Sequence, residues 1–179
     1  MLNWIQSIDW SILHGIQHTL SCGFLDFWMP KISWLGNSGM IWILSAIALL
    51  CSKKYRKYGI LLLAAIAVGV LIGNMGMKPL IARPRPCWQE SVNLLVANPT
   101  DYSFPSGHTL ASVIGAFVLT WANPKFGRIA IPLAALIAFS RLYLYVHFPS
   151  DVLAAVVLGI AIGIGVKFAY RKISRVCNL

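Results

Sequence analysis

Long stretches without a charged side chain constrain this chain more than any other feature. Residues 58–77 are consecutive uncharged residues, and the run ends where Lys78 begins a basic segment. Residues 32–51 form a second stretch of the same length, although Gly36 and Gly39 indicate that its first turns are broken or interfacial. A helix needs about 20 apolar residues to cross a bilayer. Both stretches are therefore predicted to be transmembrane helices.

Three later stretches have nearly the same character, at residues 107–122, 128–146 and 150–170. Each is long enough to cross a membrane when modest tilt is allowed. The chain is 58% hydrophobic and 11% charged, with a mean hydropathy of +0.73, which is not typical of a soluble domain. We predict an all-α polytopic membrane bundle of about six transmembrane helices, folded as one domain over residues 1–179.

The N-terminal helix, within residues 8–30, is the least defined of the six. Residues 10–25 contain no Asp, Glu, Lys or Arg, but they include two histidines and a glutamine. This segment either forms the sixth span or lies in the membrane interface as an amphipathic helix. In the second case Trp4, Trp10 and Trp28 would lie at the level of the lipid headgroups, where indole rings are favoured.

Basic residues between the predicted spans fall in three groups. They are Lys53, Lys54, Arg56 and Lys57, then Lys125 and Arg128, and finally Lys167, Arg171, Lys172 and Arg175. Positively charged loops usually face the cytoplasm, which places the 78–106 loop and the 147–150 turn on the extracytoplasmic side of the cytoplasmic membrane. Membrane topology thus explains most of the net charge of +10, and no nucleic-acid partner is predicted.

A polar fragment stands directly before one of the apolar stretches: Pro105-Ser106-Gly107-His108. Ser106 is a natural N-cap for a helix that starts there. The free amide groups and the positive dipole end of a helix N-terminus bind anions, and Gly107 would let a phosphate approach the backbone closely. Taken alone, the fragment is equally consistent with ordinary helix capping.

A second fragment places cations in a stiff loop. Lys78, Arg83 and Arg85 are interleaved with three prolines, which prevent a regular helix. Such stiffening lowers the entropic cost of ordering side chains around an anion. Lys78 would supply a point charge and Arg85 a planar fork of donors.

The third fragment combines a cation with acid–base residues. Arg141 lies near the end of an apolar stretch, where an ionisable side chain is a functional candidate. His147 follows, and Asp151 falls in the first turn of the next helix, where the dipole favours a carboxylate. A carboxylate bonded to one imidazole nitrogen leaves the other free to attack phosphorus, so His147 is the predicted nucleophile. His108 could then protonate the departing oxygen.

Together the three fragments match a signature: Lys78-x6-Arg85-Pro86, Pro105-Ser106-Gly107-His108 and Ser140-Arg141-x5-His147-x3-Asp151. This combination resembles the tripartite signature of the type 2 phosphatidic acid phosphatase superfamily, without a departure in any part.

The resemblance implies a six-helix membrane phosphatase that hydrolyses lipid phosphates or diphosphates through a phosphohistidine, with no metal or other cofactor. By position, His147 would carry the phosphoryl group, His108 would be the general acid and Asp151 the partner of His147. The implied phosphate ligands are Lys78, Arg85, Ser106, Gly107 and Arg141. Arg83 lies outside the matched positions, and its role is open.

The compact chain resembles bacterial members that act on undecaprenyl diphosphate, phosphatidylglycerol phosphate or phosphatidate. Substrate selection is expected in the 87–104 loop, where Trp88, Tyr102 and Phe104 either contact substrate or anchor the loop in the interface. A lipid phosphotransferase, a non-catalytic lipid-phosphate binder or translocator, and a sugar-phosphate hydrolase are the alternatives. The partners expected are the lipid substrate and the bilayer; the sequence does not determine an oligomeric state.

Other metal-binding or redox patterns are weak. His14 and His18 are one helical turn apart but have no third ligand at a suitable spacing, and no metal site is predicted. The four cysteines lack metal-ligand spacing, and no disulfide is predicted. They are Cys22, Cys51, Cys87 and Cys177.

Overall fold

The computed structural model describes residues 2–176, and this part of the chain is helical with no strand, which confirms the all-α prediction. In chain order the elements are α1 (Leu2–Leu20), α2 (Gly23–Leu35), the 3-10 turn η1 (Asn37–Gly39), α3 (Met40–Leu50), α4 (Arg56–Gly69), the π-helical segment η2 (Val70–Met77), α5 (Lys78–Ile81), α6 (Pro86–Gln89), α7 (Gly107–Ala122), α8 (Pro124–Tyr143) and α9 (Pro149–Val176).

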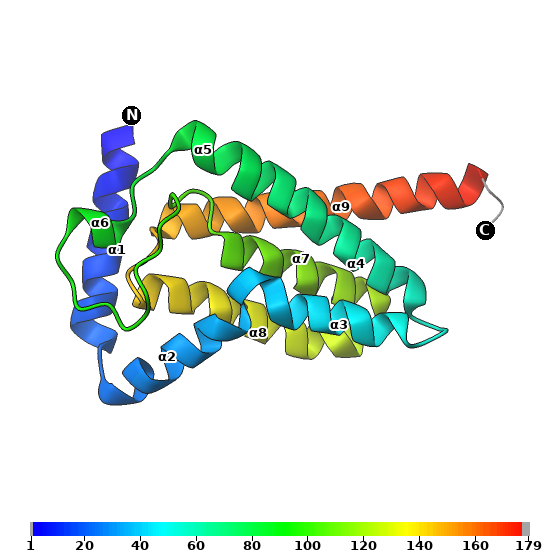
Figure 1. Ribbon diagram of the computed structural model, residues 1–179, viewed down its shortest axis with the longest axis horizontal. Coiled ribbons are helices and arrows are strands. Elements are labelled where there is room, and N and C mark those ends of the chain that lie inside the picture. Colours follow the sequence, from blue (N-terminus) through cyan, green and yellow to red (C-terminus); the bar gives the residue numbers. More distant parts are fainter. Residues whose placement is uncertain (1, 177–179) are drawn as a thin grey trace.

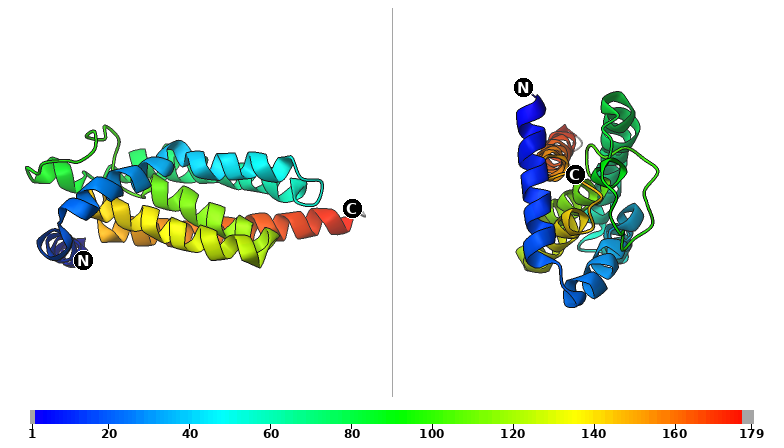
Figure 2. Two further views of the ribbon diagram at one scale, coloured as in Figure 1. Left: turned by 90° about the horizontal axis from the view of Figure 1, so that it is seen from below. Right: turned by 90° about the vertical axis from the view of Figure 1, so that its left-hand side faces the viewer.

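Helices α3, α4, α7, α8 and α9 run along one long axis, whereas α1 lies across one end of this bundle (Figure 1). Helix α7 is central, because it packs against α8, α9 and α4. The end-on and side views in Figure 2 show the same crosswise placement of α1. The long loop between α6 and α7 lies at that end too, and the end of α9 lies at the other.

Close helix packing in the core depends on glycine. A Cβ atom at Gly69 or Gly73 would come within 2.8 or 2.6 Å of side chains of α7, and one at Gly159 or Gly163 within 2.9 or 2.6 Å of others on the same helix. Small residues let helix backbones approach in membranes, where no hydrophobic effect drives association. A Cβ at Gly115 would lie 2.3 Å from the Trp42 ring. The glycine therefore leaves the space in which this indole is buried.

The long helices agree largely with the predicted spans. By length and apolar composition three helical segments could cross a membrane, namely 56–89, Pro124–Tyr143 and Pro149–Val176, and the bent pair Gly23–Leu35 with Asn37–Leu50 is a possible fourth. Helix α7 is apolar but shorter. The predicted count of six spans is therefore not reached by these criteria among the described residues.

Residues 32–51 differ from a single continuous span. The helix breaks between α2 and α3, with a bend of 45°. Ser38 has φ of 51° and Gly39 has φ of 68°, and two successive left-handed residues cannot continue a right-handed helix. Gly36 and Gly39 predict a broken first turn. The break instead separates two helices, α2 and α3.

The N-terminal region contains two helices, α1 and α2, whereas the sequence predicts a single helix there, either a span or an interfacial helix. Helix α1 is not among the segments apolar enough to cross. Its crosswise orientation is that of a helix lying in the membrane plane, which favours the interfacial alternative (Figure 2).

The three basic groups of the sequence lie together at the end of the bundle opposite the α6–α7 loop. The α3–α4 and α7–α8 connections and the end of α9 all reach this end (Figure 1). The Asn123 amide donates to the Tyr55 hydroxyl at 3.1 Å and joins the two connections. Cys22, Cys51 and Cys87 are free thiols, and Cys177 lies outside the described residues.

Candidate active site

A cavity of about 850 Å³ opens at the end of the bundle that α1 crosses. It is walled by the α2–α3 break, by α4 and η2, by the loop 96–101, and by the ends of α7 and α8. Six of the predicted site residues line it: Lys78, Arg85, Gly107, His108, Arg141 and His147. Fragments from distant parts of the chain therefore meet at one cavity, as the sequence predicts.

The start of α7 forms one wall. Ser106 is the N-cap, and its Oγ accepts from Thr109 N at 3.4 Å and from Thr109 Oγ1 at 3.0 Å. Ser106 is fully buried and does not line the cavity, so here it acts on the helix start. Gly107 does line it, and a Cβ there would stand 3.1 Å from Asn74 Oδ1. This wall combines a helix N-terminus with a bare backbone, the arrangement that binds anions.

Three cations converge on the cavity, although each is buried. Lys78, Arg85 and Arg141 are 7%, 2% and 6% exposed. Lys78 and Arg85 share the carboxylate of Asp101, which Arg85 Nη2 approaches to 2.7 Å. Arg141 bonds the hydroxyl of Ser33, and its Nε has no partner among the described residues. Buried cations with one partly exposed carboxylate between them leave a site that favours a further anion.

Asp101 is held in the charged form by this pairing. Burial acts to raise its pKa, but the bonds and charges of Lys78 and Arg85 lower it to about 2. Arg85 also donates from Nε to the Asp101 carbonyl at 2.6 Å and from Nη1 to the Val146 carbonyl at 2.6 Å. The guanidinium thus joins the α6–α7 loop to the turn between α8 and α9.

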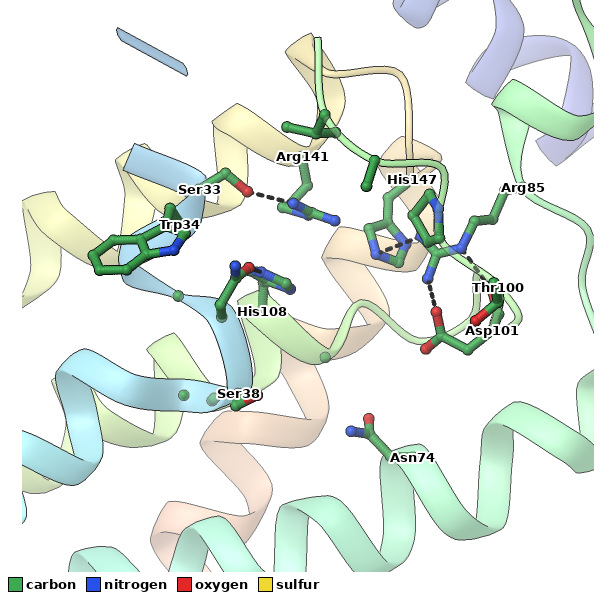
Figure 3. A pocket seen from close by; sticks show the side chains of 18 of the residues that line it. Ser33, Trp34, Ser38, Asn74, Arg85, Thr100, Asp101, His108, Arg141 and His147 are labelled. Atoms are coloured by element: carbon green, nitrogen blue, oxygen red, sulfur yellow. Dashed lines mark hydrogen bonds and ion pairs between the residues drawn. The ribbon is translucent and has the colours of Figure 1, made fainter. Parts of the chain in front are cut away.

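His147 lies in that turn with both ring nitrogens engaged. Arg85 Nη1 lies 3.1 Å from Nε2, and because a guanidinium can only donate, Nε2 carries a lone pair. The proton of a neutral ring is then on Nδ1. Burial lowers the pKa of His147 to about 3, although the Asp151 carboxylate acts to raise it. The imidazole is therefore neutral near pH 7, with Nε2 directed toward the cavity cations (Figure 3).

Asp151 meets His147 as predicted, but through an additional residue. Its Oδ2 lies 3.6 Å from His147 Nδ1, which is too long for a hydrogen bond. Ser103 Oγ bridges the gap, since it lies 3.3 Å from Nδ1 and donates to Asp151 Oδ2. Asp151 is fully buried behind the histidine and does not line the cavity.

His108 stands across the cavity from this group. Figure 3 shows its ring beside the α2–α3 break, with Arg141 on the same side and Asn74 directed inward from η2. His108 Nε2 lies 2.9 Å from Asn37 Oδ1, an acceptor that orients the ring. A Cβ at Gly36 would come within 2.9 Å of the His108 ring, so a glycine in the break lets the ring fit.

Several residues of the site, in the cavity lining or behind it, belong to no motif of the sequence. Ser103 and Asp101 lie in the polar 87–104 loop, and Asn37 and Asn74 lie in or beside apolar stretches; the isolated asparagines at membrane depth were the one available signal. Trp88, Tyr102 and Phe104, expected either to contact substrate or to anchor the loop in the interface, are not among the described lining residues. Instead Trp88 Nε1 bonds Asn98 Oδ1 at 3.0 Å and so supports the loop from behind.

The histidines of α1 do not form a metal site in the described residues. His14 Nε2 lies 3.1 Å from Glu90 Oε2. The described part of the chain has no cluster of three His, Cys, Asp or Glu residues that could hold a metal ion.

Comparison with known proteins agrees with this arrangement. The model of the PAP2 superfamily matches residues 57–175. An undecaprenyl-diphosphatase of Sulfolobus acidocaldarius is 39% identical over 121 residues, which are 66% of this chain and 58% of that protein. This chain thus spans less than two thirds of that relative. Undecaprenyl-diphosphatase BcrC of Bacillus subtilis is 30% identical over 84% of this chain and 77% of its own length.

A solved structure is similar over almost the whole chain. The transmembrane PAP2 type phosphatidylglycerolphosphate phosphatase of Bacillus subtilis superposes with a TM-score of 0.79 at 28% identity, covering 97% of this chain and 89% of that one. The family model covers all three sequence fragments and every residue that they bring to the cavity. The chain therefore belongs to the PAP2 superfamily.

Proposed function

We propose that this protein is a membrane phosphatase, with one membrane-embedded domain, that hydrolyses the phosphomonoester or diphosphate of a lipid through a phosphohistidine. One observation carries the proposal: three buried cations and the unprotonated Nε2 of a neutral histidine share one cavity. Cations stabilise the charge of a transferring phosphoryl group, and a lone pair within their reach supplies the nucleophile.

The first step is a displacement at phosphorus. The His147 Nε2 lone pair forms the N–P bond while the bond from phosphorus to the lipid oxygen breaks. Asp151 stabilises the positive charge that develops on the imidazole, through Ser103 and the Nδ1 proton. Lys78, Arg85 and Arg141 offset the charge on the phosphoryl oxygens, and Arg85 must shift from Nε2 as phosphorus approaches it.

His108 enters the reaction as the imidazolium and gives its proton to the departing oxygen, which leaves the ring neutral; it lies on the opposite side of the cavity. The bound phosphate anion offsets the neighbouring cations and so favours this charged form of the ring. In the second step His108 takes a proton from water, the water oxygen bonds to phosphorus and the N–P bond breaks. Inorganic phosphate leaves and neutral His147 is restored. No metal takes part in this sequence, because the three side-chain cations supply the charge stabilisation.

The cavity wall around His108 supports a lipid leaving group. Asn37 and Ser38 supply neutral polar groups beside the ring, Asn74 supplies another beside Gly107, and Ile66 and Val70 continue the wall along α4 and η2. A headgroup followed by an acyl or prenyl chain fits this sequence of polar and apolar surfaces. Undecaprenyl diphosphate, phosphatidylglycerol phosphate and phosphatidate are the substrates to compare.

The orientation forms part of the proposal. The basic connections lie at the end of the bundle away from the cavity, and by the positive-inside rule this supports an active site at the extracytoplasmic face of the cytoplasmic membrane. Reporters fused at residue 92 and at residue 179 should report opposite sides. Reporters on the same side would contradict this orientation.

The test is phosphate release by the purified protein in detergent with a chelator present, from the three lipids in parallel and beside His147→Ala. Release by the wild type alone supports the proposal and ranks the substrates. Transfer of the phosphoryl group to a second lipid instead of water would indicate a phosphotransferase. Lipid binding without any phosphoenzyme would contradict catalysis and indicate a binder.

A further inference from the structure

Arg83 lies outside the cavity and outside the matched signature, yet it makes a dense set of contacts. Its Nη1 donates to Asp151 Oδ1 at 2.6 Å and to Ser150 Oγ at 2.7 Å. Its Nη2 donates to Asp9 Oδ2 at 2.6 Å and to Gln6 Oε1 at 2.8 Å. The guanidinium also lies 4.1 Å from the centre of the Phe148 ring. One side chain thus ties α1 to the first turn of α9.

Asp9 completes this connection from α1. It is 2% exposed, and its Oδ1 accepts from the Ser150 amide at 2.9 Å while Oδ2 accepts from Ser150 Oγ at 2.5 Å. A buried carboxylate that bonds the second residue of α9 acts as an N-cap supplied by another helix. The family model begins at residue 57, so Asp9 belongs to a part of the chain that this match does not include.

These contacts determine how Asp151 is held. Oδ2 accepts from the Phe148 amide at 2.9 Å and from Ser103, which leads to His147. Oδ1 is bonded by Arg83. Without Arg83 the buried carboxylate would lose its cation and the bonds to Oδ1, which is costly and leaves it held through Oδ2 alone, and both effects would weaken the link to the imidazole.

We infer that Arg83 and Asp9 are positioning residues that hold Asp151, and through it the His147 ring, in the geometry for attack on phosphorus. The inference rests on the proposed function. It assigns α1, the helix that crosses the end of the bundle, an indirect part in the reaction: α1 supplies Asp9, the anion that fixes Arg83. Phosphate binding does not depend on this pair, because Lys78, Arg85 and Arg141 are held by other partners.

The test compares Arg83→Ala and Asp9→Asn with Gln17→Ala as a matched control. Gln17 anchors α1 at another point, where Nε2 donates to the Tyr143 carbonyl at 2.7 Å. Turnover and inhibition by inorganic phosphate are measured for each purified variant. We expect Arg83→Ala to lower kcat by about 10- to 100-fold, as loss of a supporting partner does, and Asp9→Asn by about 10-fold. The phosphate inhibition constant and the Gln17→Ala kcat should stay within about twofold of wild type.

A double-mutant cycle separates positioning from general damage. In an Asp151→Asn background, single-turnover phosphoenzyme formation should fall by no more than about twofold when Arg83→Ala is added, because the group through which Arg83 acts is already altered. Losses that multiply would overturn the inference. So would equal losses in Arg83→Ala and Gln17→Ala, or a changed inhibition constant with unchanged kcat.

Asp9→Asn keeps the shape of the side chain but offers one acceptor in place of two carboxylate oxygens, so it tests the inference even where Arg83→Ala does not fold. Wild-type kcat in Asp9→Asn would contradict it. Failure of the proposed function has a different appearance: the wild type itself would release no phosphate from any of the lipids.

Discussion

The two sides of the cavity are built differently. On the side of the proposed nucleophile, called the nucleophile side below, His147 is 1% exposed and Asp151 fully buried, and their polar atoms are joined to Ser103, Arg83 and neighbouring backbone. On the opposite side, His108 bonds one asparagine and faces a broken helix pair.

This difference separates two tasks of a phosphatase. The phosphoryl group and its attack are the same for every phosphate substrate, and a rigid, fully bonded group suits a fixed reaction geometry. The leaving group differs from substrate to substrate, and beside Arg141 the side that faces it has neutral polar residues, Asn37 and Ser38, from the broken helix pair. We therefore expect changes on the first side to affect all substrates equally and changes on the second to depend on the leaving group.

The largest effect is expected for His147→Ala. Removal of the nucleophile should lower turnover by about 10⁴-fold or more for every substrate, as loss of a triad member does. Steady-state phosphate release measures it, with the exposed His18→Ala as the control. Residual activity that differs between lipids would show that the nucleophile side is not the common part of the site.

His108→Ala should reduce turnover of lipid substrates by about 10²- to 10⁴-fold, the usual contribution of general acid catalysis. The loss should be much smaller with an aryl phosphate such as p-nitrophenyl phosphate, because its phenolate leaves without a proton. Parallel kinetics with both kinds of substrate test this. Equal losses for good and poor leaving groups would remove His108 from the general-acid role.

Asn37→Ala removes the acceptor 2.9 Å from His108 Nε2. One hydrogen bond contributes about 1 kcal/mol, so kcat/KM should fall by about 5- to 10-fold, and to different extents for different lipids. The comparison of undecaprenyl diphosphate with phosphatidate measures the difference. A uniform loss would mean that the two sides of the cavity are less distinct than their contacts indicate.

The smallest effect concerns Asp101, which pairs with Lys78 and Arg85 at the place where an anion would meet both. With its pKa lowered to about 2, it is charged at every working pH. Its side chain is 57% exposed, so Asp101→Asn should tighten inhibition by inorganic phosphate only about 2- to 3-fold, or about 0.5 kcal/mol. The gain should be the same at pH 6 and pH 8 apart from the ionisation of phosphate itself. Weaker inhibition would show that Asp101 orders the cations instead of competing for them.

The sequence predicted the parts of the molecule that are local. Helix α7 has the predicted bounds, and Asp151 lies in the first turn of α9 as predicted. Both follow from hydrophobic length and helix-end chemistry within a few residues, whereas the meeting of the three fragments at one cavity was expected from the order of the spans and from the family resemblance.

The contacts that could not be predicted join residues far apart in the chain. Arg83 and Asp9 are separated by 74 positions, and Ser103 and Asp151 by 48, and neither pair leaves a local pattern. The crosswise course of α1 depends on such contacts. The break between α2 and α3 could be predicted only in part. Gly36 and Gly39 indicate a break, but nothing in the sequence marks the left-handed conformation of Ser38.

The most direct test is to locate the phosphoryl group during turnover. The purified protein would be mixed with labelled lipid phosphate, quenched within milliseconds at alkaline pH, where a phosphohistidine survives, and mapped by mass spectrometry of its peptides. The account predicts a phosphoryl group on His147, in the wild type and not in His147→Ala. Phosphate release with no phosphoenzyme, or with the label on another residue, would contradict it.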